Sequence, residues 1–297
     1  MKKIIILLLS LFISVSAQAK LKVVATLPIF SSIAQEIGKD QVEIVTLGKS
    51  NQDPHFIDPK PSYVVALSNA DVLVHGGLEL ESGWLPPLVS QSRNSKILPQ
   101  SLGNIDVSLG LSLLEVPTGK VDRSAGDIHP AGNPHVWMDP RNVVVISQTI
   151  AKKLAQVSPA QADFFMKNQT DFSQDLQSHI KLWQSAIDEV KGQNIITYHK
   201  SFTYLADWMH LEVVGHIEPK PGIPPSTSHV DSLIELAKTK PVMAIVSEDF
   251  YPKKMPEYLS EKLKKPFLHL ATQPQAGESY IHFMESIVQA LKNSHHN

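Results

Sequence analysis

The chain contains no cysteine among its 297 residues. This excludes disulfides, thiolate metal sites and cysteine nucleophiles, and no cysteine is present to carry a lipid after an export signal. A metal site in this chain must therefore be built from histidine, aspartate, glutamate and water. An exported protein with neither a lipid anchor nor a disulfide fits the periplasm better than an open cell surface.

Basic charge is also scarce. Of the 27 Lys and Arg residues, Lys2 and Lys3 precede the expected mature start, which leaves 25 against 29 Asp and Glu. No dense basic patch appears, so the sequence predicts no nucleic-acid partner. We expect a monomer.

Only one long apolar run is present, and it lies at the N-terminus. Lys2 and Lys3 precede the apolar run 4–15, and Ala17-Gln-Ala19 follows it. This is the pattern of a cleavable signal peptide over residues 1–19. The mature protein is therefore expected to begin near Lys20, and to be exported and soluble.

The first half of the mature chain alternates strand-like and helical patterns. Strands are expected over residues 21–27, 42–47 and 70–75, with helices over 28–38 and 61–69. This alternation predicts a first α/β lobe over residues 20–157 with a parallel sheet. Ligands of such sheets lie beyond the carboxyl ends of the strands, where the loop carrying His55 emerges. From about Leu102 to Asn133 the periodicity dissolves, and a loop rich in turn residues is expected over residues 116–132.

The second half repeats the alternation after one long helix. Ser158-Pro159 resembles a helix start, and nothing interrupts the helix over 158–190. Some 30 residues at 1.5 Å each span about 45 Å, which suits a rigid connection between two lobes. Strands are then expected over residues 194–198, 211–217, 242–247 and 266–270 of a second lobe, 191–297. The predicted fold is α/β, with two mainly parallel sheets flanked by helices and joined by the long helix.

Three histidines lie next to turn-forming residues or at a strand end. His55 follows Asp53-Pro54, His135 follows Asn133-Pro134, and His199 ends the apolar run 195–198. Proline partly presets the backbone of the first two turns. Neutral imidazoles suit zinc and are tolerable ligands for other first-row metals. Taken alone, such a histidine is more often a structural hydrogen-bonding group than a ligand, so this spacing is only a weak indication of a metal site.

Three segments around these histidines resemble one protein family in order and spacing. They are Asp53-Pro-His55 with Pro59-Lys-Pro61-Ser62, Asn133-Pro-His135-Val-Trp137-Met-Asp139-Pro140, and Tyr198-His199 with Tyr204-Leu205. The family is the cluster A-I solute-binding proteins, the periplasmic metal-binding subunits of zinc and manganese ABC importers. The resemblance covers the whole mature chain, and Asn-Pro-His-x-Trp-x-Asp-Pro is its most specific part.

The resemblance implies that His55, His135 and His199 bind the metal. A histidine at the third position is typical of zinc-type members, whereas manganese-type members often have glutamate there. In many relatives an aspartate after the last strand is the fourth ligand, but residues 270–277 contain no acid. This departure leaves the fourth ligand open.

Glu248, at the end of an earlier strand of the second lobe, is our candidate for that position. It could also be an ordinary acid at a helix N-terminus, and Glu218, His129 or water are the alternative ligands. The long acidic and His-rich loop of some zinc-type members is missing. Residues 122–129 are either a reduced version of it or a plain loop.

The resemblance implies a carrier that captures a divalent metal between its lobes and delivers it to an inner-membrane ABC permease. Zn²⁺ is expected, with Mn²⁺ or Fe²⁺ as alternatives. A secreted zinc hydrolase with a His₃-water site is the rival from another class, with Glu248 as its general base. The absence of a His-Glu-x-x-His motif argues against that hydrolase. An adhesin of the same family is a third alternative that the sequence does not separate from a carrier.

Overall fold

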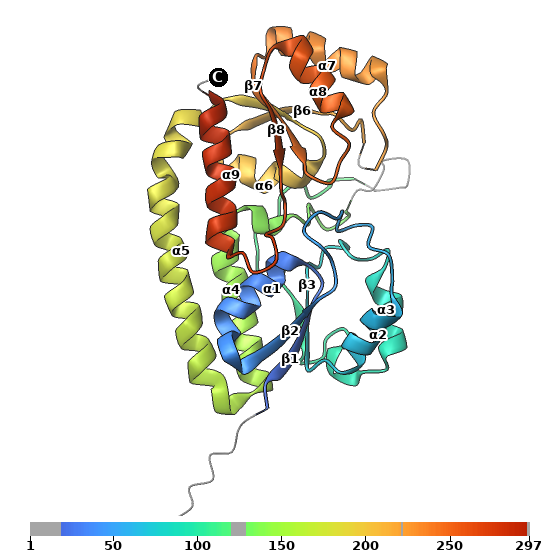
Figure 1. Ribbon diagram of the computed structural model, residues 1–297, viewed down its shortest axis with the longest axis vertical. Coiled ribbons are helices and arrows are strands. Elements are labelled where there is room, and N and C mark those ends of the chain that lie inside the picture. The colour runs from blue at the N-terminus through green and yellow to red at the C-terminus, as the bar shows by residue number, and fades with distance from the viewer. Residues whose placement is uncertain (1–18, 120–128, 221, 296–297) are drawn as a thin grey trace, which may run out of the picture.

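The computed structural model describes residues 19–119, 129–220 and 222–295. These residues form two α/β lobes, each with a four-stranded parallel sheet, and one long helix lies alongside both lobes (Figure 1). Residues 1–18 of the expected signal peptide and residues 122–128 lie outside the described residues. Within the described ranges, no helix is both long and apolar enough to cross a membrane.

The first lobe has the strand order β2-β1-β3-β4, with all neighbours parallel. Its strands are β1 (Leu21–Ala25), β2 (Val42–Thr46), β3 (Val72–His75) and β4 (Asn104–Asp106). Its first three helices are α1 (Pro28–Gly38), α2 (Pro61–Ser68) and α3 (Leu85–Ser92).

The three predicted strands of this lobe are confirmed, but β4 was not predicted, because it lies where the sequence shows no periodicity. This strand has only three residues, too few to show a period. Its pairing with β3 and the complete burial of Ile105 define it instead. Helix α3, which includes Pro86 and Pro87, was not anticipated either.

The crevice at which the strand order of this sheet reverses lies between β1 and β3, the usual ligand position in such folds. Here the buried side chain of Glu81 joins the two strand ends. Its Oε1 accepts hydrogen bonds from the Thr26 hydroxyl at 2.7 Å and from the Gly76 amide at 2.8 Å. The loop after β2 carries His55 and reaches the second lobe, where the Tyr251 hydroxyl lies 3.4 Å from Asp53.

The second lobe has the strand order β6-β5-β7-β8, again parallel throughout. Its strands are β5 (Asn194–Thr197), β6 (Glu212–His216), β7 (Val242–Glu248) and β8 (Phe267–Leu270). Its helices are α6 (Thr203–Met209), α7 (Thr227–Thr239), α8 (Lys254–Leu263) and α9 (Tyr280–His295). All seven residues of β7 are buried, as expected for a central parallel strand covered on both faces.

The long helix is α5 (Ala162–Val190), with 29 residues. It packs against α1 and α4 (Pro140–Val157) of the first lobe and against α9 of the second, so the predicted connection is confirmed. Its start is later than expected because residues 159–161 form a separate 3-10 turn. The Ser158 hydroxyl donates to the side chain of Gln161 at 2.8 Å instead of capping α5.

The strap, the segment of residues 271–279 between β8 and α9, also joins the lobes. The Trp137 indole donates to the Thr272 carbonyl at 2.8 Å, and the Tyr280 hydroxyl donates to the Trp137 carbonyl at 3.0 Å. The buried Gln273 side chain accepts the Ile29 amide of α1 at 3.1 Å. It thereby satisfies one of the free N–H groups at the start of that helix. One continuous apolar core includes residues from both lobes.

Candidate metal centre

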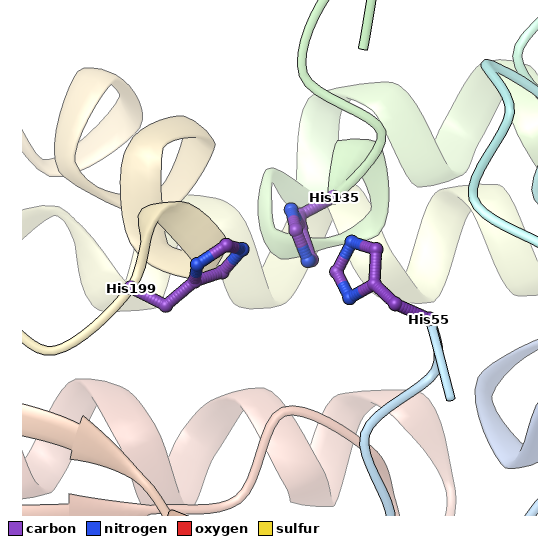
Figure 2. A group of neighbouring side chains, drawn as sticks. All are labelled: His55, His135 and His199. Atoms are coloured by element: carbon purple, nitrogen blue, oxygen red, sulfur yellow. The ribbon is translucent and has the colours of Figure 1, made fainter. Parts of the chain in front are cut away.

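His55, His135 and His199 converge between the two lobes, as the sequence indicated (Figure 2). One nitrogen of each ring can be chosen so that all three lie within 4.8 Å of one another. The ring centroids are 5.3 to 5.6 Å apart. Nitrogens that share a tetrahedral zinc ion lie roughly 3.3 Å apart, so small side-chain movements would bring the rings into contact with one ion.

His55 comes from the loop after β2 and is fixed by its own turn. Asp53 accepts hydrogen bonds from the His55 backbone amide at 3.0 Å and from ring Nδ1 at 2.7 Å. The buried indole of Trp84 donates to the Pro54 carbonyl at 3.0 Å. The proline and these three contacts hold the His55 ring with Nε2 toward the other histidines.

His135 precedes the 3-10 turn Val136–Met138, which leads into α4. Gly132 adopts φ 121, and a Cβ there would lie 3.0 Å from the Leu114 carbonyl, so only glycine suits this position. The Asn133 side-chain oxygen then accepts the His135 backbone amide and ring Nδ1, each at 2.9 Å. Asp139 caps α4 by accepting the Arg141 amide at 2.8 Å.

His199 follows β5 in the second lobe. The Thr197 hydroxyl donates to the His199 carbonyl at 2.8 Å. The buried carboxylate of Glu218, beyond the end of neighbouring β6, accepts from ring Nδ1 at 2.8 Å. Neighbouring parallel strands thus place a histidine and its acceptor side by side, although they are 19 residues apart.

Each of the three rings therefore has an oxygen acceptor at Nδ1. A neutral imidazole that donates through Nδ1 has its free lone pair on Nε2. The Nε2 atoms of His55 and His135 are buried and have no hydrogen-bond partner among the described residues. This is the arrangement of metal-ligating histidines, whose outer nitrogen is held by a carboxylate or carbonyl oxygen.

The protonation of the rings differs. Burial and the neighbouring imidazoles hold the pKa of His135 well below its usual value, so this ring is neutral. Burial alone would lower the pKa of His199, but the hydrogen bond to Glu218 and the charge of Glu248 raise it instead. Burial would likewise raise the pKa of Asp53, yet its hydrogen bond with His55 lowers it, so Asp53 is a carboxylate.

Glu248, the expected fourth ligand, is the last residue of β7 and is fully buried. Neither carboxylate oxygen has a hydrogen-bond partner in the described part of the chain. Burial raises the pKa of Glu248 to about 7, and the proximity of His199 and Ser201 opposes the shift only in part. Glu248 does not belong to the group whose ligand atoms lie within 4.8 Å of one another.

The two alternative side chains occupy different positions. Glu218 holds the outer nitrogen of His199, as described above. The ring centroid of His129 lies 5.3 Å from that of His55. Among the residues that the structure describes, neither side chain belongs to the group of three histidines.

Aromatic side chains of the second lobe cover one side of the site. The rings of Tyr198 and Tyr251 stack at 4.3 Å, and the Tyr251 hydroxyl lies 3.4 Å from Asp53 in the first lobe. The roles of Tyr251, Asp53, Asn133 and Glu218 were not predicted from the sequence. Asp53 and Asn133 had a readable signal, because each stands two residues before a histidine with a proline between.

Comparisons with known proteins identify a family and several similar proteins. The family model described as zinc-uptake complex component A, periplasmic (ZnuA), matches residues 23–294. The zinc-binding lipoprotein AdcA of Streptococcus pneumoniae strain R6 is 26% identical over 309 residues, covering 99% of this chain. The chain spans only 61% of the length of that relative. The manganese ABC transporter substrate-binding lipoprotein PsaA of Streptococcus mitis is 24% identical, covering 90% of this chain and 86% of PsaA.

Solved structures share the fold. A crystal structure of ZnuA superposes with a TM-score of 0.78 at 24% identity and covers 93% of this chain and 99% of its own. A laminin-binding adhesin (Lmb) from Streptococcus agalactiae, in mutant form, superposes with a TM-score of 0.75 at 20% identity, covering 92% and 99%. The family match extends over residues 23–294 of the 297, and this chain belongs to the ZnuA family of zinc-uptake components.

Proposed function

We propose that this protein is the periplasmic binding component of an ABC importer. It captures Zn²⁺ between its lobes through His55, His135 and His199 and delivers the ion to an inner-membrane permease. The observation that carries this proposal is the convergence of three buried imidazoles from both lobes, each with its outer nitrogen held by an oxygen. Such preorganisation lowers the cost of ordering ligands around an ion.

Charge balance also favours a cation at this place. Asp53 and Glu218 each face the outer nitrogen of one ligand ring. Burying a carboxylate without a partner costs several kcal/mol or shifts its pKa, as it does at Glu248. A dication near His199 would offset that cost, and we propose Glu248 as the fourth ligand, reached by a change of its side-chain rotamer.

Zinc is favoured over manganese by the donor set. Three imidazole nitrogens suit zinc, whereas manganese prefers more carboxylate and water oxygens. The named relatives include both a zinc-binding and a manganese-transporting protein. The preference for zinc is therefore argued from the ligands of this chain. The family consists of binding components of uptake systems, and this argues for a carrier over a hydrolase.

Titration of the metal-free protein tests the proposal. Zinc affinity, measured by competition with a chromophoric chelator, should fall at least 100-fold in His55→Ala, His135→Ala and His199→Ala. The exposed His282 provides the matched control, and His282→Ala should bind as the unchanged protein does. An unchanged affinity in His135→Ala would refute the assignment.

The fourth ligand needs a separate measurement. Cobalt absorption reports coordination number and geometry, and Glu248→Gln should alter the visible band if Glu248 ligates. Glu261→Gln, at an exposed acid of α8, is the control. An identical band in Glu248→Gln would assign the fourth position to another group. Elemental analysis of protein isolated from the periplasm would identify the metal and test the location.

A further inference from the structure

Asn133 is a buried residue that contacts both lobes at the site. Its side-chain oxygen faces the first lobe and accepts the amide and ring Nδ1 of His135. Its side-chain nitrogen faces the second lobe and donates to the Lys200 carbonyl at 2.9 Å and to the Thr203 hydroxyl at 3.2 Å. Lys200 is the residue directly after His199.

Further contacts fix Asn133 in this position. Its side-chain nitrogen also donates to Glu115 Oε2 at 2.9 Å, and Glu115 Oε1 pairs with the Lys200 ammonium at 3.1 Å. The Tyr204 hydroxyl of α6 donates to the Asn133 carbonyl at 2.9 Å. The backbone and the side chain of Asn133 are thus both tied to the second lobe.

These partners determine which way the amide points. The Lys200 carbonyl and the Glu115 carboxylate can only accept, so the NH₂ group must face them and the oxygen must face His135. The His135 ring must then donate from Nδ1, which leaves Nε2 for an ion. No carboxylate could replace this amide, because one of its oxygens would then face two other acceptors.

We propose that Asn133 is a positioning residue that sets the placement of His135 relative to His199 across the two lobes. It connects the ring of one ligand with the backbone next to the other. Asp53 and Glu218 each serve a single histidine ring, whereas Asn133 acts on the distance between two ligands. This inference rests on the proposed metal-binding function.

The substitution Asn133→Asp separates this role from that of a simple acceptor. A carboxylate behind an imidazole makes it a more basic ligand, so a mere acceptor could be replaced by aspartate without loss of affinity. A residue that joins the lobes could not be replaced by aspartate in this way. The carboxylate oxygen that takes the place of the amide nitrogen would repel Glu115 and the Lys200 carbonyl. We therefore expect zinc affinity to fall about 10-fold or more and the cobalt absorption band to change.

Asn168→Asp is the matched control. The Asn168 amide donates to the Ile37 carbonyl at 2.9 Å, where α5 meets α1, away from the histidines. Both variants replace a carbonyl-bound amide, so both should lower the melting temperature of the metal-free protein. Only Asn133→Asp should change zinc affinity and the cobalt band.

A second substitution tests whether repulsion from Glu115 causes the loss of zinc affinity. Glu115→Gln in the Asn133→Asp background removes one repelling carboxylate and should recover part of the lost affinity. If Asn133→Asp does not fold, Asn133→Ser replaces it. Serine has a shorter side chain and lacks the amide that donates to Lys200 and Thr203 of the second lobe, so the same loss is expected. Wild-type affinity with an unchanged cobalt band in the folded variant would overturn the proposal, as would a loss that Glu115→Gln leaves unaltered.

A failure of this inference can be told apart from a failure of the proposed function. If His135→Ala retains zinc, the metal-site assignment fails whatever Asn133 does. If His135→Ala loses zinc while Asn133→Asp keeps it, the site stands and only the role of Asn133 is refuted.

Discussion

His199 and Glu218 form a buried pair in which 2.8 Å separates ring Nδ1 from carboxylate Oε2. The hydrogen bond raises the pKa of His199 against the opposing effect of burial. It also orients Nε2 toward His55 and His135. Glu218 therefore tunes both the direction and the basicity of one ligand, without itself belonging to the group of three.

Glu218→Gln should weaken zinc binding about 10-fold at pH 7.5, because the amide orients the ring but leaves it less basic. The pKa of His199 should fall, and this can be followed by NMR titration of the metal-free protein. Glu212→Gln, at an exposed position of the neighbouring β6, is the control. Unchanged affinity together with an unchanged His199 pKa would contradict this role.

Zinc binding should release protons between pH 6 and 7, and the number should rise as the pH falls. The pKa of His135 is lowered by burial, so that ring has no proton to lose. The raised pKa of His199 and the pKa of about 7 at Glu248 make these two groups the sources. Affinity should accordingly decline as the pH falls toward 6.

Calorimetric titrations in buffers of different ionisation enthalpy would count these protons. The Glu248→Gln variant should release fewer protons at pH 7 than the unchanged protein. A binding enthalpy that is independent of the buffer between pH 6 and 7 would refute the assignment.

The metal-free protein should lose stability as the pH rises. The folded-state pKa of Glu248 is about 7, above the ordinary value of 4.5. Its contribution to the free energy of unfolding is therefore complete below about pH 4.5 and is lost as the pH rises through 7. Between these limits the contribution of Glu248 changes by roughly 3 kcal/mol. The raised pKa of His199 likewise makes the metal-free protein less stable as the pH rises.

Urea unfolding at pH 5.5, 7 and 8 with a chelator present measures this effect. Glu248→Gln should be the more pH-independent protein, whereas Glu261→Gln should behave as the unchanged chain. A steeper pH dependence in Glu248→Gln would be incompatible with the argument.

Much of the fold could be predicted from periodicity, because strands such as β7 are continuous apolar runs between turn residues. Strand β4 could not, since three residues show no period and pairing with β3 defines them. The start of α5 was misplaced for a local reason. Ser158-Pro159 has the composition of a helix start, but the Ser158 hydroxyl bonds Gln161 instead.

The three histidines could be predicted because their neighbours in the sequence form motifs. Contacts between neighbouring strands or across the lobes form no motif in the sequence. Glu218 meets His199 only because β5 and β6 are neighbours in the sheet, and Tyr251 meets Asp53 only across the lobes. Such pairs depend on the strand order, which the sequence pattern did not supply.

The contact between the strap and α1 is expected to stabilise the fold without affecting metal binding. Gln273 accepts the Ile29 amide at the start of α1, a helix without a side-chain cap of its own. Gln273→Ala would leave that buried amide unsatisfied and remove packing, so it should destabilise the metal-free protein by about 1–3 kcal/mol. Zinc affinity should change less than twofold, because Gln273 has no hydrogen bond to the three histidines.

Gln275→Ala is the matched control, since that exposed side chain contacts only the Ser50 hydroxyl, at 2.9 Å, among the hydrogen bonds described for it. It should leave the unfolding midpoint within experimental error. Chemical unfolding and chelator competition on the same samples separate the two effects. A large loss of zinc affinity in Gln273→Ala without a loss of stability would mean that the strap acts on the metal site, and not through the junction between α1 and the second lobe.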